Sequence, residues 1–235
     1  MLFSSPLVEG RLIRRYKRFL ADIQLEGAGV ITAAVPNTGS MMGCCDAGNR
    51  VWLSESDSAT RKYRHTWELV EIGEVMVGIN TGRPNALVAE AIGDGTITEL
   101  AGYSVMRREV GYGEEGSRVD LVLEAPPRKP CYVEVKNVTA AASRGIALFP
   151  DSVSVRGARH LRELIRLKAR GLRPVQLYCV QRGDVGEVRP ADGIDYEYGR
   201  TLREAIAAGV EVMAYRAKVT PAEIRLEERI PVVCP

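Results

Sequence analysis

The chain has 235 residues, of which 46% are hydrophobic and 26% charged, a composition that indicates one large or two small folded domains and excludes intrinsic disorder. Lys and Arg number 32 against 30 Asp and Glu, so the net charge of +2 provides almost no global field to attract a polyanion. Every apolar stretch ends before the roughly 18 residues that a membrane helix needs, and the N-terminus lacks the charged-then-apolar order of a secretory signal. We therefore expect a cytoplasmic protein without a membrane segment.

The five cysteines are an odd number and include no CxxC pair. Neither a disulfide framework nor a zinc ribbon fits this spacing. Free thiols in a reducing compartment are the prediction, which agrees with a cytoplasmic location.

Short segments of alternating hydrophobicity follow one another up to about residue 80. They are residues 10–23, 30–35, 50–53 and 74–79, and clusters of Gly, Asn and Ser separate them. Strands about ten residues apart, joined by turns of this composition, are typical of a small barrel. The sequence therefore predicts an OB-like β-barrel domain over residues 1–82.

The hydrophobic period changes at TGRPN, where Pro84 fits the first turn of a helix that ends near Gly93. The pattern that follows predicts strands at residues 102–110, 118–123 and 131–138, a helix at 156–169, a strand at 174–181, a helix at 198–208 and a strand at 211–215. An α-β-β-β-α-β order predicts an α/β domain over residues 83–235. The whole chain is then an α+β protein.

Three charged residues lie inside two apolar strands in SRVDLVLEAPPRKPCYVEVKNVT. Asp120 is on the first strand, and Glu134 and Lys136 share one face of the second because side chains alternate. Burying an ion is costly unless it pairs or binds a metal. Two carboxylates and the Val135 carbonyl form a hard oxygen site for Mg²⁺ or Mn²⁺, and a neighbouring ammonium can orient a water that attacks a phosphodiester. An ion pair of purely structural role is the alternative.

The predicted helix before these strands carries a further carboxylate. Glu90 lies about 60° from Leu87 around a helix of 100° per residue, at the border of the apolar face, from which it could face the strands. The predicted order is a helix that carries a carboxylate, a strand that carries Asp, a strand that carries the ExK motif, and then a helix and a strand. This order resembles the PD-(D/E)XK nuclease core. The candidate catalytic residues are therefore Asp120, Glu134, Lys136 and Glu90, although a solvated helix face remains the alternative for Glu90.

Basic residues concentrate in two segments of the predicted barrel, GRLIRRYKRF and RKYRHTW. Cationic side chains beside aromatic rings are how barrel domains hold nucleic acid, and in the second segment the strand period places Tyr63, His65 and Trp67 on one face. A solvated strand face with core aromatics is the alternative. The predicted DNA-binding residues are Arg11, Arg14, Arg15, Lys17, Arg18, Arg61, Lys62, Arg64 and His65.

GYGEEG, residues 111–116, matches a dinucleotide-binding motif, but a strand rather than a helix follows it, so we interpret it as a hairpin loop. The chain has no other cofactor motif, which disfavours a small-molecule enzyme.

The sequence resembles the sugar fermentation stimulation protein A (SfsA) family along nearly its whole length. The shared motifs are LVEGRLIRRYKRFLADI, PNTGSM, VWLSESDS, RKYRHTWELVE, VGINTGRPNALVAEAI, SRVDLVL, CYVEVKNVT, LFPDSVSVRGARHLREL and QLYCVQR. The resemblance implies an OB-fold DNA-binding domain followed by a PD-(D/E)XK nuclease-like domain, with Asp120, Glu134 and Lys136 at catalytic positions and Glu90 as a fourth. The chain departs from the family at Ala34-Val35, where a His-Cys pair usually precedes PNTG.

Two functional hypotheses follow. The first is a DNA-binding nuclease that depends on Mg²⁺ or Mn²⁺; the second is a non-catalytic DNA-binding regulator of sugar metabolism, especially of maltose, on a nuclease-like scaffold. A homodimer would place two metal sites on opposite strands of a duplex.

Overall fold

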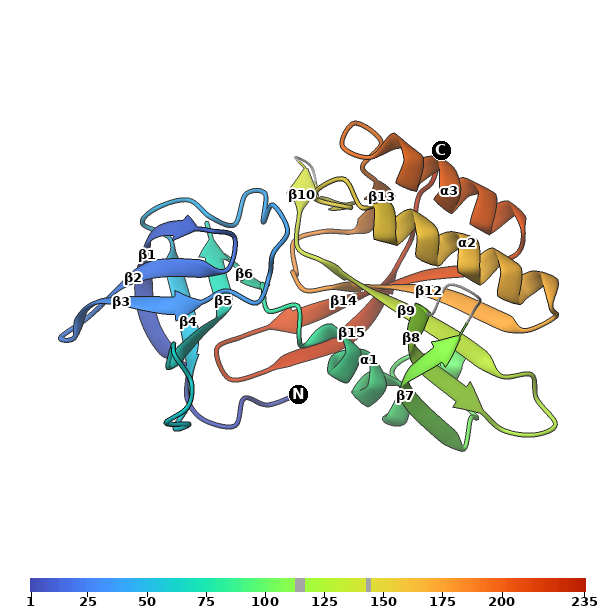
Figure 1. Cartoon of the computed structure of the whole chain (residues 1–235), viewed down its shortest axis with the longest axis horizontal. Helices are drawn as coiled ribbons and strands as arrows, with labels where there is room; N and C mark the ends of the chain where they lie inside the picture. The colour runs from blue at the N-terminus through green and yellow to red at the C-terminus, as the bar shows by residue number, and fades with distance from the viewer. Residues whose placement is uncertain (113–116, 143–144) are drawn as a thin grey trace.

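The computed structural model describes residues 1–112, 117–142 and 145–235. A β-barrel and a larger α/β domain lie side by side, with the barrel formed by the first third of the chain (Figure 1). The GYGEEG segment, predicted as a hairpin loop, falls outside the described residues at positions 113–116.

Six strands form the N-terminal sheet, in the order β3-β2-β1-β4-β5-β6. They are β1 (Val8–Tyr16), β2 (Leu20–Leu25), β3 (Gly29–Ala34), β4 (Arg50–Glu55), β5 (His65–Ile72) and β6 (Val75–Gly78). A parallel pairing of Ala34 on β3 with Thr66 on β5 closes the first five into a barrel. The alternating pattern places Leu12, Ile23 and Leu53 in the interior, fully buried. The predicted OB-like barrel is confirmed.

Two local predictions in the barrel were wrong. Residues 10–23 form two strands rather than one, because Lys17 and Arg18 adopt positive φ angles of 51° and 65° in a tight turn between β1 and β2. The strand expected at RKYRHTW begins only at His65, so Tyr63 lies outside it. Trp67 is fully buried, with its indole N–H donating to the Leu69 carbonyl at 2.8 Å. A large apolar ring is more stable in the barrel core than on a solvated face.

The described residues of the second domain form two sheets and three α-helices. The main sheet has the order β15-β14-β12-β9-β8-β7, and a small sheet has the order β10-β11-β13. The strands are β7 (Val105–Tyr112), β8 (Ser117–Glu124), β9 (Cys131–Val138), β10 (Ala141–Ala142), β11 (Ile146–Phe149), β12 (Arg173–Val180), β13 (Glu187–Pro190), β14 (Glu211–Val219) and β15 (Ile224–Ile230). The helices are α1 (Pro84–Gly93), α2 (Val155–Ala169), α3 (Tyr196–Ala207) and the 3₁₀ turn η1 (Thr98–Leu100).

The helices cover both faces of the main sheet, α1 on one side and α2 with α3 on the other (Figure 1). Helix α2 turns Leu161, Leu164 and Leu167 toward the strands, and its N-terminus is capped by Ser154, whose side chain accepts a hydrogen bond from the Gly157 N–H. The predicted order α-β-β-β-α-β is present, extended by α3, β14 and the antiparallel edge strand β15.

A buried carboxylate fixes the junction between the domains. Glu68 on β5 is 1% exposed and accepts hydrogen bonds from Ser54 in the barrel and from Asn80 and Arg83 in the NTGRPN linker, residues 80–85. Both oxygens of the buried Glu68 carboxylate therefore accept hydrogen bonds from the protein, which replace those that water would donate. The linker motif thus holds α1 at a defined position beside the barrel.

None of the helices in the described part of the chain has the length and hydropathy to cross a membrane. All five cysteines lie among the described residues and are free thiols.

Candidate active site

The candidate site lies where strands β8 and β9 diverge. Their pairing runs from Leu123 and Cys131 to Leu121 and Val133 and then ends. The next N–H on this edge of β9, that of Val135, donates instead to the Asp120 carboxylate at 2.7 Å. The N–H and C=O groups of one strand residue point to the same edge, so the Val135 carbonyl faces the same opening.

Glu134, the residue before Val135 on β9, carries a buried oxygen without a hydrogen-bond partner in the described part of the chain. The residue is 3% exposed, and its Oε1 accepts hydrogen bonds from the Lys136 ammonium at 2.7 Å and from the His160 imidazole. Its Oε2 is buried and has no hydrogen-bond partner among the described residues. A buried acceptor without a donor is costly, so this oxygen is suited to a ligand that is not part of the chain.

The tautomer of His160 follows from its two neighbours. The Arg156 Nε–H donates to the imidazole Nε2 at 3.2 Å, which requires Nε2 to carry no proton. The proton therefore resides on Nδ1, which donates to Glu134 Oε1. Helix α2 thereby fixes the rotamer of a carboxylate on the sheet, with Oε2 turned away from both donors.

Asp120 is held by α1 as well as by β9. Its Oδ1 accepts a hydrogen bond from the Asn85 side chain at 2.8 Å. Burial and the negative charge of Glu134 raise the pKa of Asp120 above its ordinary value. Burial also opposes ionisation of Glu134, but the charge of Lys136 and the hydrogen bond from His160 outweigh it and lower the pKa of Glu134. A cation between the two carboxylates would relieve their repulsion.

These residues fit a divalent cation. The carboxylates of Asp120 and Glu134 and the Val135 carbonyl are oxygen donors of the kind that a hard divalent cation takes. Among the described residues, no group of three or more His, Cys, Asp or Glu side chains is placed to hold a metal ion. Other buried polar atoms near Glu134 also lack partners in the described structure. They are the Gln176 Oε1, whose amide nitrogen donates to the Glu134 carbonyl, and the Tyr112 hydroxyl, whose pKa burial and the charge of Glu134 raise.

The structure does not bring Glu90 to this site, which corrects the sequence prediction. Its side chain is 45% exposed and pairs with the N-terminal ammonium of Met1 at 2.6 Å. Asn85 and Glu90 are five residues apart, which is about 140° around a helix. Because the Asn85 side of α1 faces Asp120, Glu90 is directed away from it.

The barrel gathers most of the predicted DNA-binding residues at one end. Tyr16 pairs with Leu20, Leu20 with Ala34, and Ala34 with Thr66, so the β1–β2 turn and the start of β5 are at the same end of the barrel. Lys17 and Arg18 therefore lie at the end of the barrel where residues 61–65 enter β5, with β2 and β3 between the two segments. Arg11 lies toward the other end of β1, opposite Gln24 and Arg50.

Several of these cations are already engaged within the protein. Arg14 pairs with Asp22 at 2.8 Å and Arg64 with Glu55 at 2.9 Å. Four other predicted residues also have partners: Arg11 donates to the Gly48 carbonyl, Arg61 donates to the Thr66 hydroxyl, His65 lies near the Glu55 carboxylate, and Lys62 lies over the Tyr63 ring.

Arg15 holds a loop in place. Its guanidinium donates to the backbone carbonyls of Arg18, Asn37, Gly39 and Ser40, at 2.7 to 3.3 Å. The PNTGS loop is thereby fixed to the β1–β2 turn. Lys17 and Arg18 are the exposed cations at this end whose side chains have no partner in the described residues.

Sequence reasoning missed three residues near the site. His160 and Asn85 contact Glu134 and Asp120, and Glu163, one turn after His160, is 1% exposed and paired with Arg166. The available signal was spacing: His160 and Glu163 share the helix face that carries Leu164 and Leu167, where a polar residue is buried.

Comparisons with known proteins agree with this architecture. Residues 13–79 match the family described as SfsA N-terminal OB domain, and residues 82–223 match the Sugar fermentation stimulation protein RE domain. A sugar fermentation stimulation protein homolog from Thioalkalivibrio sulfidiphilus is 57% identical over 227 residues, 97% of this chain and 95% of that protein. A homolog from a Geobacter species is 58% identical over 233 residues, 99% of this chain and 100% of that protein.

The structure of Pyrococcus furiosus SfsA in complex with Ca²⁺ superposes with a TM-score of 0.89 at 27% identity, over 99% of this chain and 98% of that one. The two family matches cover adjoining parts of the chain, and the relatives match it over nearly its full length. The chain therefore belongs to the sugar fermentation stimulation protein family.

Proposed function

We propose that this protein is a cytoplasmic, divalent-metal-dependent nuclease that binds DNA through its barrel. The observation that carries the proposal is the buried Oε2 of Glu134, which has no hydrogen-bond partner among the described residues and belongs to a carboxylate whose charge raises the pKa of the neighbouring Asp120. Its relative from Pyrococcus furiosus, described as a complex with Ca²⁺, supports a divalent cation as the ligand.

Asp120, Glu134 and the Val135 carbonyl would hold Mg²⁺ or Mn²⁺. When bound, such an ion supplies Lewis acidity and lowers the pKa of water. Lys136 is 13% exposed and close enough to Glu134 to orient a water on the same side of the sheet. His160 and Asn85 hold the two carboxylates in position, as residues behind metal ligands commonly do.

DNA binding would use the barrel end that carries Lys17 and Arg18. Both side chains are exposed, and that end of the barrel adjoins the second domain, where Ser40 donates to the Asp151 carbonyl at 2.6 Å. Phosphates bound there would lead a strand toward the domain that carries Asp120 and Glu134.

The test is cleavage of supercoiled, linear and single-stranded DNA by the purified protein in EDTA, Mg²⁺ or Mn²⁺. Glu134→Ala and Asp120→Asn should abolish cleavage and leave DNA affinity unchanged or higher, because repulsion of phosphate falls. Glu124→Gln, on the same strand as Asp120 but paired with the exposed Arg107, is the matched control and should cleave normally. Thermal unfolding of each variant confirms that it is folded.

Binding without cleavage in any metal, identical in wild type and Glu134→Ala, would reject the nuclease. That outcome would support the alternative, a DNA-binding regulator of sugar metabolism on a nuclease-like scaffold. Equal loss of binding and cleavage in Glu134→Ala would contradict the division of roles between the two domains.

A further inference from the structure

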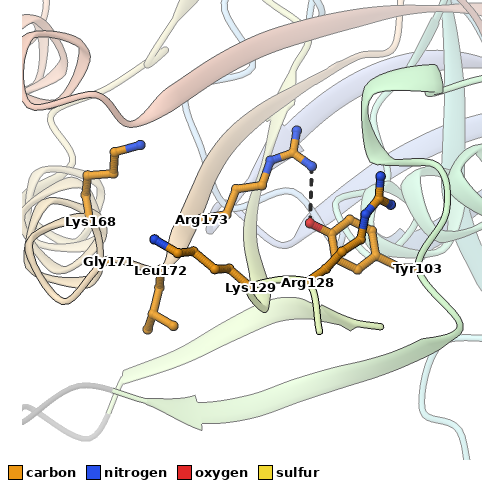
Figure 2. Close-up of a pocket in the computed structure, with 7 residues that line it drawn as sticks. All are labelled: Tyr103, Arg128, Lys129, Lys168, Gly171, Leu172 and Arg173. Atoms are coloured by element: carbon orange, nitrogen blue, oxygen red, sulfur yellow. Dashed lines mark hydrogen bonds between the residues drawn. The ribbon is translucent and has the colours of Figure 1, made fainter. Parts of the chain in front are cut away.

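A second, strongly basic hollow lies at the start of strands β9 and β12. It has a volume of about 390 Å³ and is lined by Tyr103, Arg128, Lys129, Lys168, Gly171, Leu172 and Arg173. These residues come from the loop before β9, the end of α2 and the start of β12, and from the segment after η1 (Figure 2). None of the seven lining residues is acidic.

Two arginines form a fixed wall of this hollow. Arg173 makes a two-pronged ion pair with Glu211, both contacts at 2.7 Å, and donates to the Tyr103 hydroxyl at 3.2 Å. Arg128 lies over the Tyr103 ring and donates to the carbonyls of Ala101 and Gly102. The charge of Arg173 is neutralised by the Glu211 carboxylate, whereas the partners of Arg128 in the described part of the chain are all neutral.

Two lysines complete the charge. The side-chain ammonium groups of Lys129 and Lys168 have no hydrogen bond or ion pair to any described residue. Lys129 reaches the hollow from the loop before β9 and Lys168 from the last turn of α2 (Figure 2). Gly171 has a φ of +75°, a conformation that favours glycine. A Cβ added there would lie 3.5 Å from the Lys129 ammonium, so Lys129 lies close to the backbone at Gly171. Arg128, Lys129 and Lys168 therefore provide three positive charges without a carboxylate.

We propose that this hollow binds a phosphate monoester. Such a group carries nearly two negative charges and three strong acceptor oxygens, which suits several cations converging on one small space better than a singly charged diester does. The hollow is separate from the nuclease site: Cys131 at the start of β9 is three residues from Glu134, roughly 10 Å at about 3.3 Å per residue. The phosphate comes either from a free small ligand or from the 5′ end of a polynucleotide.

The experiment uses calorimetric titration of the full chain at constant ionic strength, with chloride as the reference anion. The ligands are inorganic phosphate, pyrophosphate, and one oligonucleotide prepared with a 5′-phosphate and with a 5′-hydroxyl. Wild type is compared with K129A/K168A and with K218A, which removes an exposed lysine on β14 far along the sequence from the hollow. Loss of two charge-assisted contacts should weaken phosphate binding at least about tenfold in the double variant, with K218A unchanged.

Two outcomes would support the site and identify its ligand. Saturable binding of inorganic phosphate or pyrophosphate that weakens in K129A/K168A, with no difference between the oligonucleotides, indicates a small phosphorylated ligand. A preference for the 5′-phosphorylated oligonucleotide that disappears in K129A/K168A indicates a polynucleotide end. The proposal is rejected if no ligand binds beyond the chloride reference, or if wild type and double variant bind equally. Cleavage is not a readout, so failure here leaves the proposed nuclease untouched.

Discussion

His160 on α2 and Glu134 on β9 are 26 residues apart in the sequence, and the imidazole Nδ1 of one is hydrogen-bonded to the carboxylate Oε1 of the other. The contact joins a helix to the sheet that it covers, and the second oxygen of Glu134 has no partner among the residues that the structure describes. His160 therefore positions a proposed metal ligand and is not itself proposed to bind the metal. Its loss should therefore weaken metal binding more than DNA binding.

We expect His160→Ala to lower metal-dependent cleavage by about 10- to 100-fold, the range typical of residues behind metal ligands. The concentration of Mn²⁺ giving half-maximal rate should rise, while DNA affinity stays unchanged. His160→Asn, whose amide can still donate to Glu134, should recover part of the activity. Arg162→Ala is the control: Arg162 is on the same helix as His160, and its exposed side chain pairs only with Glu197 of α3 among the described residues. Normal Mn²⁺ dependence in a folded His160→Ala protein would contradict the role of His160.

Arg15 and Arg18 should separate stability from DNA binding. Arg15→Ala removes the donors that hold the PNTGS loop and should lower the free energy of unfolding by about 1–3 kcal/mol. Arg18→Ala removes an exposed charge and should leave stability nearly unchanged while reducing DNA affinity and the slope of its salt dependence. Urea unfolding and DNA titration at several salt concentrations measure both effects. Equal stability of the two variants would show that the Arg15 contacts contribute little.

Asp151 should couple the two domains. Its carboxylate accepts hydrogen bonds from the Met41 N–H at 2.9 Å and the Ser40 hydroxyl at 3.1 Å, across the junction. Asp151→Ala should lower the free energy of unfolding by about 1–2 kcal/mol and increase protease cleavage in the PNTGSM loop, whereas Asp151→Asn keeps an acceptor and should cost less. Gly39→Ala should resemble Asp151→Ala, because a Cβ there would lie 2.8 Å from the carboxylate. Unchanged protease resistance in both variants would exclude this coupling.

Because three of its thiols are buried, we expect the free energy of unfolding of the protein to fall at alkaline pH. Burial raises the pKa of Cys44, Cys131 and Cys179 to about 12, from an ordinary value of 9.0. As pH rises, these thiols ionise in the unfolded chain before they ionise in the folded protein. Their contribution to the free energy of unfolding is therefore complete below pH 9 and is lost as pH rises toward 12, by at most about 1.4 kcal/mol per pH unit for each thiol.

The measurement is urea unfolding between pH 8 and 10, with Cys131→Ala compared with the half-buried Cys234→Ala. Cys131→Ala should reduce the pH dependence more than Cys234→Ala does. An identical pH dependence in wild type and Cys131→Ala would rule out this origin.

The sequence alone determined the fold class and the strand part of the candidate site. The alternation of apolar and polar residues over a short segment defines a strand and its two faces. This local pattern is enough to predict that Glu134 and Lys136 share a face and that Asp120 lies next to them. The same kind of reasoning predicted a barrel followed by an α/β domain, because turn composition and the change of hydrophobic period are properties of neighbouring residues.

Only the tertiary structure decided which distant groups meet. Glu90 and Asn85 are both polar residues on α1, and the angle at which α1 packs on β8 brings Asn85 to Asp120 and leaves Glu90 with Met1. Arg15, which in the sequence is one of several basic residues, proved to hold a loop. Local propensity sets side-chain periodicity, but contacts between segments far apart depend on how whole elements pack, and that information is spread over the entire chain.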